Sequence, residues 1–149
     1  MKVIILAAGE GKRLRPYTNS QPKCMVKFSN QSIVERLIDQ LVRFGINSAD
    51  IVMVTGYMHA KLDYLPVEKV HNRNFFKTNM VHSLMCAEKK LMSGDDVLII
   101  YGDIILSDDA MKVAIEQNAG INVLSNTEWK KLWEARMDNP LSDLETFRL

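Results

Sequence analysis

The chain has 149 residues, of which 19 are lysine or arginine and 18 are aspartate or glutamate. This balance argues against nucleic-acid binding, which favours a basic surface, and there is no run of about 18 apolar residues that could cross a membrane. Cys24 and Cys86 have no C-x-x-C spacing, which argues against a disulfide framework or a zinc site. We therefore expect a cytoplasmic protein of one domain, residues 1–149, with no nucleic-acid and no membrane partner.

The chain opens with a short apolar run that leads into glycines and cations. Apart from Lys2, residues 2–8 are apolar and include β-branched side chains, which predicts a strand buried on both faces. Gly9 and Gly11 follow, and because glycine has no Cβ, each can adopt a positive φ and let main-chain N–H groups approach an anion. The cations that can then pair with phosphate oxygens are Lys12, Arg13, Arg15 and Lys23. The segment predicts a site for nucleotide phosphates, with candidate nucleotide-binding residues Leu6, Ala7, Ala8, Gly9 and Gly11.

Two common phosphate-binding motifs do not fit this segment. A dinucleotide fingerprint, G-x-G-x-x-G, requires glycine where Leu14 stands, and a Walker A loop requires glycine at Leu6 and serine or threonine at Arg13. A tight strand-to-helix turn with solvated basic side chains is the alternative interpretation. The pattern G-x-G-x-R followed by Pro22-Lys23 resembles the signature of the sugar-phosphate and alcohol-phosphate nucleotidyltransferases, which join a phosphorylated small molecule to a nucleoside monophosphate.

Strands and helices alternate along the rest of the chain. Ser32 and Glu35 fit a capping box, and apolar residues at helical spacing predict a helix that begins there and stops at Gly45. Further strands are expected at residues 50–55, 67–71, 96–101 and 120–124, and further helices at residues 58–64, 80–92 and 108–117. This alternation predicts an α/β fold, a Rossmann-like three-layer α/β/α domain with a mostly parallel central sheet. Ligands bind beyond the C-terminal strand ends of such sheets, where Gly9, Thr55 and Gly102 lie.

Residues 78–84, T-N-M-V-H-S-L, lie at the start of a predicted helix. Thr78, Asn79 and Ser83 can hydrogen-bond the base or ribose of a nucleotide, and a helix N-terminus presents N–H groups to a ligand. A capping role explains the same residues equally well, with Thr78 or Asn79 as the N-cap and Ser83 one turn later. The pattern T-N-x-x-x-S-L resembles the phosphocholine cytidylyltransferase branch of the superfamily, which implies CTP as the nucleotide.

Another buried strand ends in a carboxylate. Residues 97–101 are apolar, and Gly102 and Asp103 follow. The glycine lets a nucleotide approach closely, and the carboxylate suits Mg²⁺, which prefers carboxylates together with phosphate oxygens and water. The resemblance implies the same role, because in these nucleotidyltransferases an aspartate that ends this strand binds the catalytic metal. We therefore expect Asp103 as the metal ligand and Mg²⁺ as the cofactor.

Trp129 and Trp133 are spaced to lie on one face of a helix. Packing against the sheet explains such a pair, but indole faces also attract ammonium groups, with about 0.5 to 2 kcal/mol per contact, and Asp143 and Glu145 add negative charge. The patterns W-x-x-x-W-x-x-R and P-L-x-D-x-E resemble the substrate-binding segment of the choline-phosphate branch. Asn126 departs from this resemblance, which has an aspartate at that position.

Together the patterns predict an enzyme that transfers CMP from CTP to a small phosphorylated or phosphonate alcohol or amine and releases pyrophosphate. The residues expected to act in catalysis are Arg13, Lys23 and Asp103. A sugar-1-phosphate nucleotidyltransferase and a catalytically impaired nucleotide-binding module are the alternatives. The resemblance also implies that the C-terminal part of the family domain, with a second aspartate for the metal, is lacking here, and an exposed apolar edge would then favour a homo-oligomer.

Overall fold

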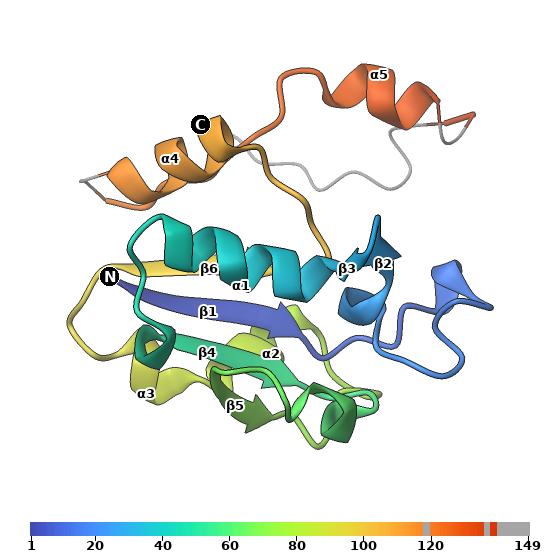
Figure 1. The fold of residues 1–149 in the computed structure, drawn as a ribbon, viewed down its shortest axis with the longest axis horizontal. Helices are drawn as coiled ribbons and strands as arrows, with labels where there is room; N and C mark the ends of the chain where they lie inside the picture. Colours follow the sequence, from blue (N-terminus) through green and yellow to red (C-terminus); the bar gives the residue numbers. More distant parts are fainter. Residues whose placement is uncertain (118–119, 136–137, 140–149) are drawn as a thin grey trace. The chain divides into compact units, whose positions relative to one another are not determined.

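Four parallel strands form a sheet in the N-terminal part of the protein (Figure 1). The computed structural model describes residues 1–117, 120–135 and 138–139. The strands are β1 (Lys2–Ala7), β4 (Ile51–Thr55), β5 (Glu68–His71) and β6 (Val97–Tyr101), in the order β5-β4-β1-β6. β1 is central, so that Ala7 lies beside Thr55 and Leu6 lies beside Tyr101. The predicted parallel sheet is confirmed, and these strands agree with their predicted ranges to within a residue.

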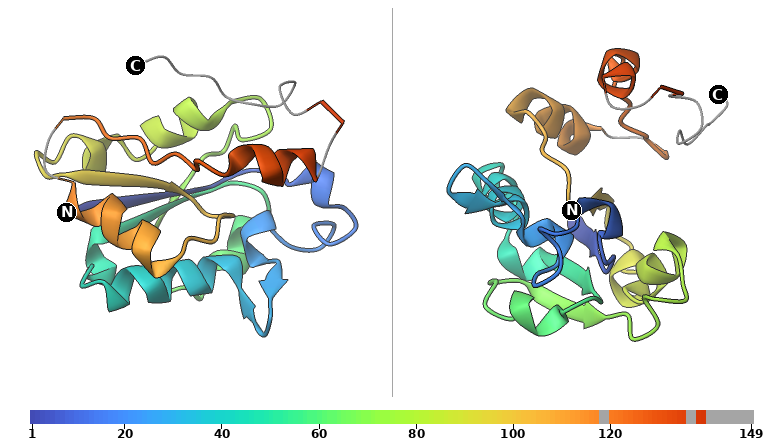
Figure 2. Two further views of the ribbon diagram at one scale, coloured as in Figure 1. Left: turned by 90° about the horizontal axis from the view of Figure 1, so that it is seen from above. Right: turned by 90° about the vertical axis from the view of Figure 1, so that its right-hand side faces the viewer.

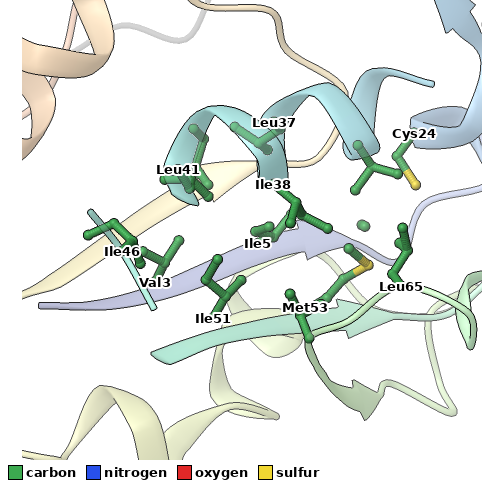
Figure 3. Packing of buried hydrophobic residues seen from close by; sticks show 14 of the residues in the cluster. Val3, Ile5, Cys24, Leu37, Ile38, Leu41, Ile46, Ile51, Met53 and Leu65 are labelled. Carbon is green, nitrogen blue, oxygen red and sulfur yellow. The ribbon is translucent and has the colours of Figure 1, made fainter. Parts of the chain in front are cut away.

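Helices cover both faces of this sheet (Figure 2). Successive side chains of a strand point to opposite faces. Val3 and Ile5 therefore pack with Leu41 and other residues of the first helix (Figure 3), whereas Ile4 packs with Ala87 on the opposite side. The helices on the first face are α1 (Ile33–Arg43) and α4 (Asp108–Glu116), and those on the second are α2 (Met80–Met85) and α3 (Glu88–Leu91). The predicted three-layer α/β/α arrangement is confirmed.

The chain divides into two units, Met1–Glu116 and Gln117–Leu149. The first unit holds the sheet, and the second contains the described helix α5 (Trp129–Glu134). Short elements complete the first unit: the hairpin strands β2 (Lys27–Phe28) and β3 (Gln31–Ser32), and the 3₁₀ turns η1 (Lys12–Leu14), η2 (Lys23–Met25), η3 (Ser48–Asp50) and η4 (His59–Leu62). Among the described residues, no helix combines the length and the apolar character needed to span a bilayer.

The capping box predicted at the start of α1 is present. The Ser32 hydroxyl accepts a hydrogen bond from the Glu35 main-chain N–H at 3.3 Å, and the Glu35 carboxylate accepts from the Ser32 N–H at 2.9 Å. The same carboxylate accepts from the Ser32 and Tyr64 hydroxyls, and these bonds hold the pKa of Glu35 below its usual value. At its other end the helix stops at Gly45, whose φ of 87° only glycine adopts readily.

Three predicted elements differ from the structure. The helix expected at 58–64 is a single 3₁₀ turn, η4. The helix expected at 80–92 is interrupted where the main-chain hydrogen bonds tighten, with Ala87 N–H donating to Leu84 O at 2.9 Å, and the buried Ala87 packs against the sheet at this break. The strand expected at 120–124 is wrong: these residues pair with no described strand, and Ile121 is 98% exposed. Alternating apolar residues do not form a strand without a hydrogen-bonded neighbour.

Ser32→Ala should lower the free energy of unfolding by about 1 kcal/mol at neutral pH, because it removes the N-cap of α1. Since the pKa of Glu35 is lowered in the folded state, the stabilisation from its bonds with Ser32 is present above the unfolded pKa and is lost as the pH falls through the folded pKa. The difference in the free energy of unfolding between the wild type and Ser32→Ala should therefore become smaller at acid pH. Urea unfolding at neutral pH and at about pH 3 checks this, with exposed Ser20→Ala as the control; an equal deficit at both pH values would contradict it.

Candidate functional site

The C-terminal edge of the sheet is where β1, β4 and β6 end together, because all strands are parallel. The chain passes from β1 through α1 to β4 on one face, and from β5 through α2 and α3 to β6 on the other. The direction of winding therefore reverses between β1 and β6. Such a reversal leaves a crevice beyond the strand ends, which is the usual ligand site of open parallel sheets.

Two glycines let neighbouring segments close around the end of β1. Gly102 N–H donates to Leu6 O at 2.9 Å, and a Cβ at Gly102 would lie 3.0 Å from the Cβ of Ala7. On the other side, Tyr57 N–H donates to Ala8 O at 3.0 Å, and a Cβ at Gly56 would lie 2.5 Å from that oxygen. The candidate residues at the end of β1 are thus enclosed by main chain, with Ala7 and Ala8 buried.

The segment from Gly9 to Lys23, called here the glycine loop, folds back on itself. Gly11 adopts the left-handed conformation, with a φ of 65°, and its carbonyl accepts from the Thr18 hydroxyl at 2.9 Å. A Cβ at Gly11 would lie 2.8 Å from the Cβ of Lys23. Gly11 thus uses the freedom that glycine allows, whereas Gly9 does not adopt a positive φ and is exposed with open space around it.

An ion pair joins the glycine loop to the end of β6. Lys23 begins η2 directly after the buried Pro22, and its ammonium group pairs with the carboxylate of Asp103. The side chains of Lys23 and Asp103 are 38% and 25% exposed. Both charges therefore reach solvent, and each can take another partner without the desolvation cost of a buried ion. The structure brings together two of the three residues expected in catalysis.

Glu10 is an acidic residue of the glycine loop that the sequence interpretation passed over. Its carboxylate pairs with the ammonium of Lys12 at 3.5 Å and with the guanidinium of Arg15 at 3.7 Å. Arg13, the third residue expected in catalysis, lies on η1 with an exposed side chain. An anion that enters the loop must therefore compete with Glu10 for two of the predicted cations.

The cysteine next to Lys23 is not available as a nucleophile. Cys24 is 2% exposed, and burial raises the pKa of its thiol to about 12. The thiol is protonated at neutral pH, whereas the thiolate is the reactive form. The chemistry at this edge of the sheet therefore depends on charges and main-chain groups.

The residues at the start of α2 are held by a buried asparagine. Asn79 is the N-cap, because its side chain accepts from His82 N–H at 3.2 Å, which confirms the capping interpretation. Asn72 is 1% exposed and donates to the hydroxyls of Thr78 and Ser83, both at 3.0 Å. The sequence interpretation missed Asn72, although a polar residue directly after a predicted parallel strand is a usable signal. The nucleotide-binding role of Thr78, Asn79 and Ser83 stays a prediction.

Tyr57 was also missed. It follows β4, and its hydroxyl donates to the main-chain oxygen of Thr18 at 3.2 Å. This bond joins the end of β4 to the glycine loop. Gly56 and Tyr57 come directly after a predicted strand, so the position of Tyr57 at this edge was within reach of the sequence.

Asp103 is the carboxylate that the structure offers to a metal at this edge. A carboxylate at a strand end, partly exposed and next to the glycine loop, fits the donor preference of Mg²⁺. Within the described part of the chain, no group of three or more histidine, cysteine, aspartate or glutamate residues could enclose a metal. The fit is therefore to an ion that takes its other ligands from phosphates and water.

The predicted acceptor residues lie in the second unit. Trp129 and Trp133 are both on α5, four residues apart and partly exposed. The side-chain oxygen of Asn126 accepts from Glu128 N–H at 2.9 Å and so orders the turn before this helix. Asp143 and Glu145 lie outside the described residues. Acceptor binding by these residues stays a prediction.

Residues 3–128 match the family described as the MobA-like NTP transferase domain. The CTP:phosphoglutamine cytidylyltransferase of Campylobacter jejuni is 38% identical in an alignment that covers 100% of this chain and 62% of that protein. The choline-phosphate cytidylyltransferase of Streptococcus pneumoniae is 39% identical over 61% of this chain and 41% of that protein. These similarities confirm the resemblance found in the sequence.

The solved structures that match this chain are also nucleotidyltransferases. The CTP:phosphocholine cytidylyltransferase from Streptococcus pneumoniae matches with a TM-score of 0.63 and 34% identity, over 68% of this chain and 44% of that one. The inositol-1-phosphate CTP transferase from T. maritima matches with a TM-score of 0.61 and 25% identity, over 79% and 49% of the two chains. The Rossmann-like α/β class is confirmed. The chain spans less than two thirds of the length of these relatives.

Gly11→Ala should lower the free energy of unfolding by at least about 1 to 2 kcal/mol, because the left-handed conformation disfavours a Cβ and this Cβ would overlap Lys23. Gly9→Ala is the matched control, since a Cβ there meets nothing within 4 Å, and it should stay within about 1 kcal/mol of the wild type. Urea unfolding of both variants provides the measurement. Equal effects at the two positions would show that the loop conformation at Gly11 is not required.

Proposed function

Because the chain belongs to the MobA-like NTP transferase domain family, we propose that it transfers CMP from CTP to a small phosphorylated acceptor and releases pyrophosphate. The relatives whose alignments support this proposal act on phosphoglutamine and phosphocholine, as their names state. The acceptor class that follows is a phosphate or phosphonate carried by a small amine, amide or alcohol.

The observation that carries the proposal is the meeting of the glycine loop with the end of β6. Gly11 packs against Lys23, and the Lys23 ammonium pairs with Asp103. A triphosphate needs main-chain donors and cations on one side and a carboxylate-bound cation on the other. The Lys23–Asp103 ion pair joins the glycine loop, which offers the donors and cations, to the carboxylate at the end of β6. The pair lies at the C-terminal edge of the sheet, where the direction of winding reverses.

The reaction needs no nucleophile from the protein. An oxygen of the acceptor phosphate attacks the α-phosphorus of CTP in line, the bond from that phosphorus to the oxygen bridging to the β-phosphate breaks, and pyrophosphate leaves with the electron pair. The attacking oxygen is already anionic at neutral pH, so no general base has to remove a proton. The protonated, buried Cys24 is consistent with this path. Catalysis then consists of positioning and charge stabilisation.

Each candidate residue has one task in this scheme. The main-chain N–H groups of Gly9 and Gly11 and the guanidinium of Arg13 hold the β- and γ-phosphates. The ammonium of Lys23 stabilises the negative charge that develops around the transferred phosphoryl group. Asp103 holds Mg²⁺, which when bound would offset negative charge on the phosphates. Main-chain groups at Leu6, Ala7, Ala8 and Gly102 border the nucleotide, with Thr78, Asn79 and Ser83 on its nucleoside side.

The second unit is the proposed source of acceptor contacts. Two partly exposed indoles four residues apart on α5, Trp129 and Trp133, offer faces that attract an ammonium group. Asp143 and Glu145 would add negative charge for the same group. Asn126 is neutral where the choline-phosphate pattern is acidic, and a neutral position suits an amide-bearing acceptor better than it suits a quaternary amine.

A pyrophosphate-release screen tests the function. CTP and UTP are each combined with phosphocholine, phosphoglutamine, 2-aminoethylphosphonate and hexose 1-phosphates in the presence of Mg²⁺. Release with CTP and an amine or amide acceptor is the expected result. Release only with a hexose 1-phosphate would make the chain a sugar-phosphate nucleotidyltransferase. If calorimetry shows CTP binding but no acceptor leads to pyrophosphate release, the chain is a nucleotide-binding module without transferase activity.

Lys23→Ala and Asp103→Asn should each lower kcat/KM for CMP transfer by about 100-fold or more, because each removes a charge that acts on the phosphates during transfer. Neither should change the free energy of unfolding by more than about 1 kcal/mol, since an ion pair that is partly exposed to solvent contributes little. Lys89→Ala, at an exposed position of α3, is the charge-matched control and should keep full activity. An active Lys23→Ala enzyme would remove Lys23 from the mechanism.

A further inference from the structure

Asn72 is the buried polar residue that ties the start of α2 to the sheet. It comes directly after β5, is 1% exposed, and its main-chain N–H donates to Thr55 O at the end of β4 at 2.8 Å. Its side-chain oxygen accepts from Asn74 N–H at 2.9 Å. A main-chain N–H can only donate, so this bond identifies the oxygen of the amide and leaves both amide hydrogens for other partners.

The two amide hydrogens of Asn72 go to two hydroxyl oxygens. The side-chain nitrogen is 3.0 Å from Thr78 Oγ1 and 3.0 Å from Ser83 Oγ. The hydroxyls in turn donate to main-chain carbonyls, Thr78 to Asn74 O at 2.9 Å and Ser83 to Asn79 O at 3.3 Å. Every hydrogen of this network is committed within the protein. What each hydroxyl has left is an oxygen lone pair, which can only accept.

Of the two residues that carry these hydroxyls, Thr78 is the more accessible to a ligand. Thr78 is partly exposed, whereas Ser83 is buried with 6% exposure. A ligand that approaches Thr78 therefore meets a hydroxyl oxygen whose orientation is fixed by the hydrogen bond from the Asn72 amide. A hydrogen-bond donor on the ligand, such as an amino group or a hydroxyl, satisfies it, whereas a carbonyl oxygen does not.

The segment from Asn72 to Met80 runs beside the end of β1. A Cβ at Gly56 would lie 2.7 Å from the Cβ of Phe75 and 2.5 Å from Ala8 O, so Phe75 and Ala8 both lie close against that glycine. At the other end of the segment, the Tyr101 hydroxyl at the end of β6 is 2.8 Å from the sulfur of Met80. The network around Asn72 thus borders the same edge of the sheet as the glycine loop.

We propose that Asn72 is a positioning residue for the nucleoside half of the substrate, which orients the Thr78 hydroxyl as an acceptor for a hydrogen-bond donor of the nucleoside. The proposal rests on the proposed function, because it assigns the nucleotide to this edge of the sheet. The donor is either the amino group of cytosine or a ribose hydroxyl. The phosphates, held by the glycine loop, do not depend on Asn72.

Calorimetry with CTP, UTP and inorganic tripolyphosphate tests the proposal on the full chain. Asn72→Ala should weaken CTP binding about tenfold, as expected for one lost hydrogen bond, and should leave tripolyphosphate binding unchanged. If Asn72→Ala weakens the binding of CTP but not of UTP, the donor is the amino group of the base. If it weakens the binding of both nucleotides equally, the donor is a ribose hydroxyl. Asn47→Ala is the matched control, an asparagine that orders a turn before β4, at the opposite edge of the sheet.

Thr78→Val keeps the proposal testable if Asn72→Ala does not fold. It removes the hydroxyl but keeps the shape of the side chain, and it should weaken CTP about tenfold while tripolyphosphate binding is unchanged. If Asn72 acts through Thr78, Asn72→Ala should have little further effect on CTP binding in the Thr78→Val background.

Three outcomes overturn the proposal. Unchanged CTP affinity in folded Asn72→Ala or in Thr78→Val shows that the nucleoside does not use this acceptor. Equal weakening of CTP and tripolyphosphate shows that the substitution merely loosens the fold. A wild-type chain that binds tripolyphosphate but neither nucleotide refutes the proposed function. The proposed role of Asn72, which depends on that function, is then refuted as well.

Discussion

The parallel pairing of β1 with β4 on one side and β6 on the other is the constraint on which the candidate site depends. Val3, Ile4 and Ile5 are fully buried between helices on both faces, so the register of the central strand cannot shift without exposing one of two apolar clusters. The register puts Ala7 beside Thr55 and Leu6 beside Tyr101. Segments far apart in the chain therefore end at one edge, and the loops that follow them are brought together.

The ion pair between Lys23 and Asp103 is the electrostatic result of this convergence. Without a nucleotide, the ammonium and the carboxylate neutralise one another, and their partial exposure keeps the cost of charge near the sheet low. Glu10 pairs with both Lys12 and Arg15 and balances one of their two positive charges. The glycine loop still carries a net positive charge, because its four cations, Lys12, Arg13, Arg15 and Lys23, outnumber the carboxylates of Glu10 and Asp103, and a triphosphate would gain Lys12, Arg15 and Lys23 by exchange with these carboxylates.

The sequence predicted the elements whose signal is local. The apolar runs of β1 and β6, the capping box at Ser32 and the left-handed turn at Gly11 each follow from a few neighbouring residues. Features that depend on distant partners were missed or wrong. The bond from Tyr57 to Thr18 needs the loops to be placed first, and the strand expected at 120–124 lacks a pairing neighbour among the described residues. The roles of the site residues follow from chemistry that no fold alone determines.

The two halves of the candidate site are held by different forces, and this difference has a functional consequence. On the glycine-loop side, exposed charges are paired with one another and can exchange partners at little cost. Around Asn72, a network of neutral groups with every hydrogen already donated resists rearrangement, because the buried Asn72 amide would lose its hydrogen bonds without gaining water. A ligand bound across both halves would therefore be selected by the rigid neutral side and would reorganise the charged side. Under the proposed function, recognition of the nucleoside and binding of the phosphates would then be able to vary independently.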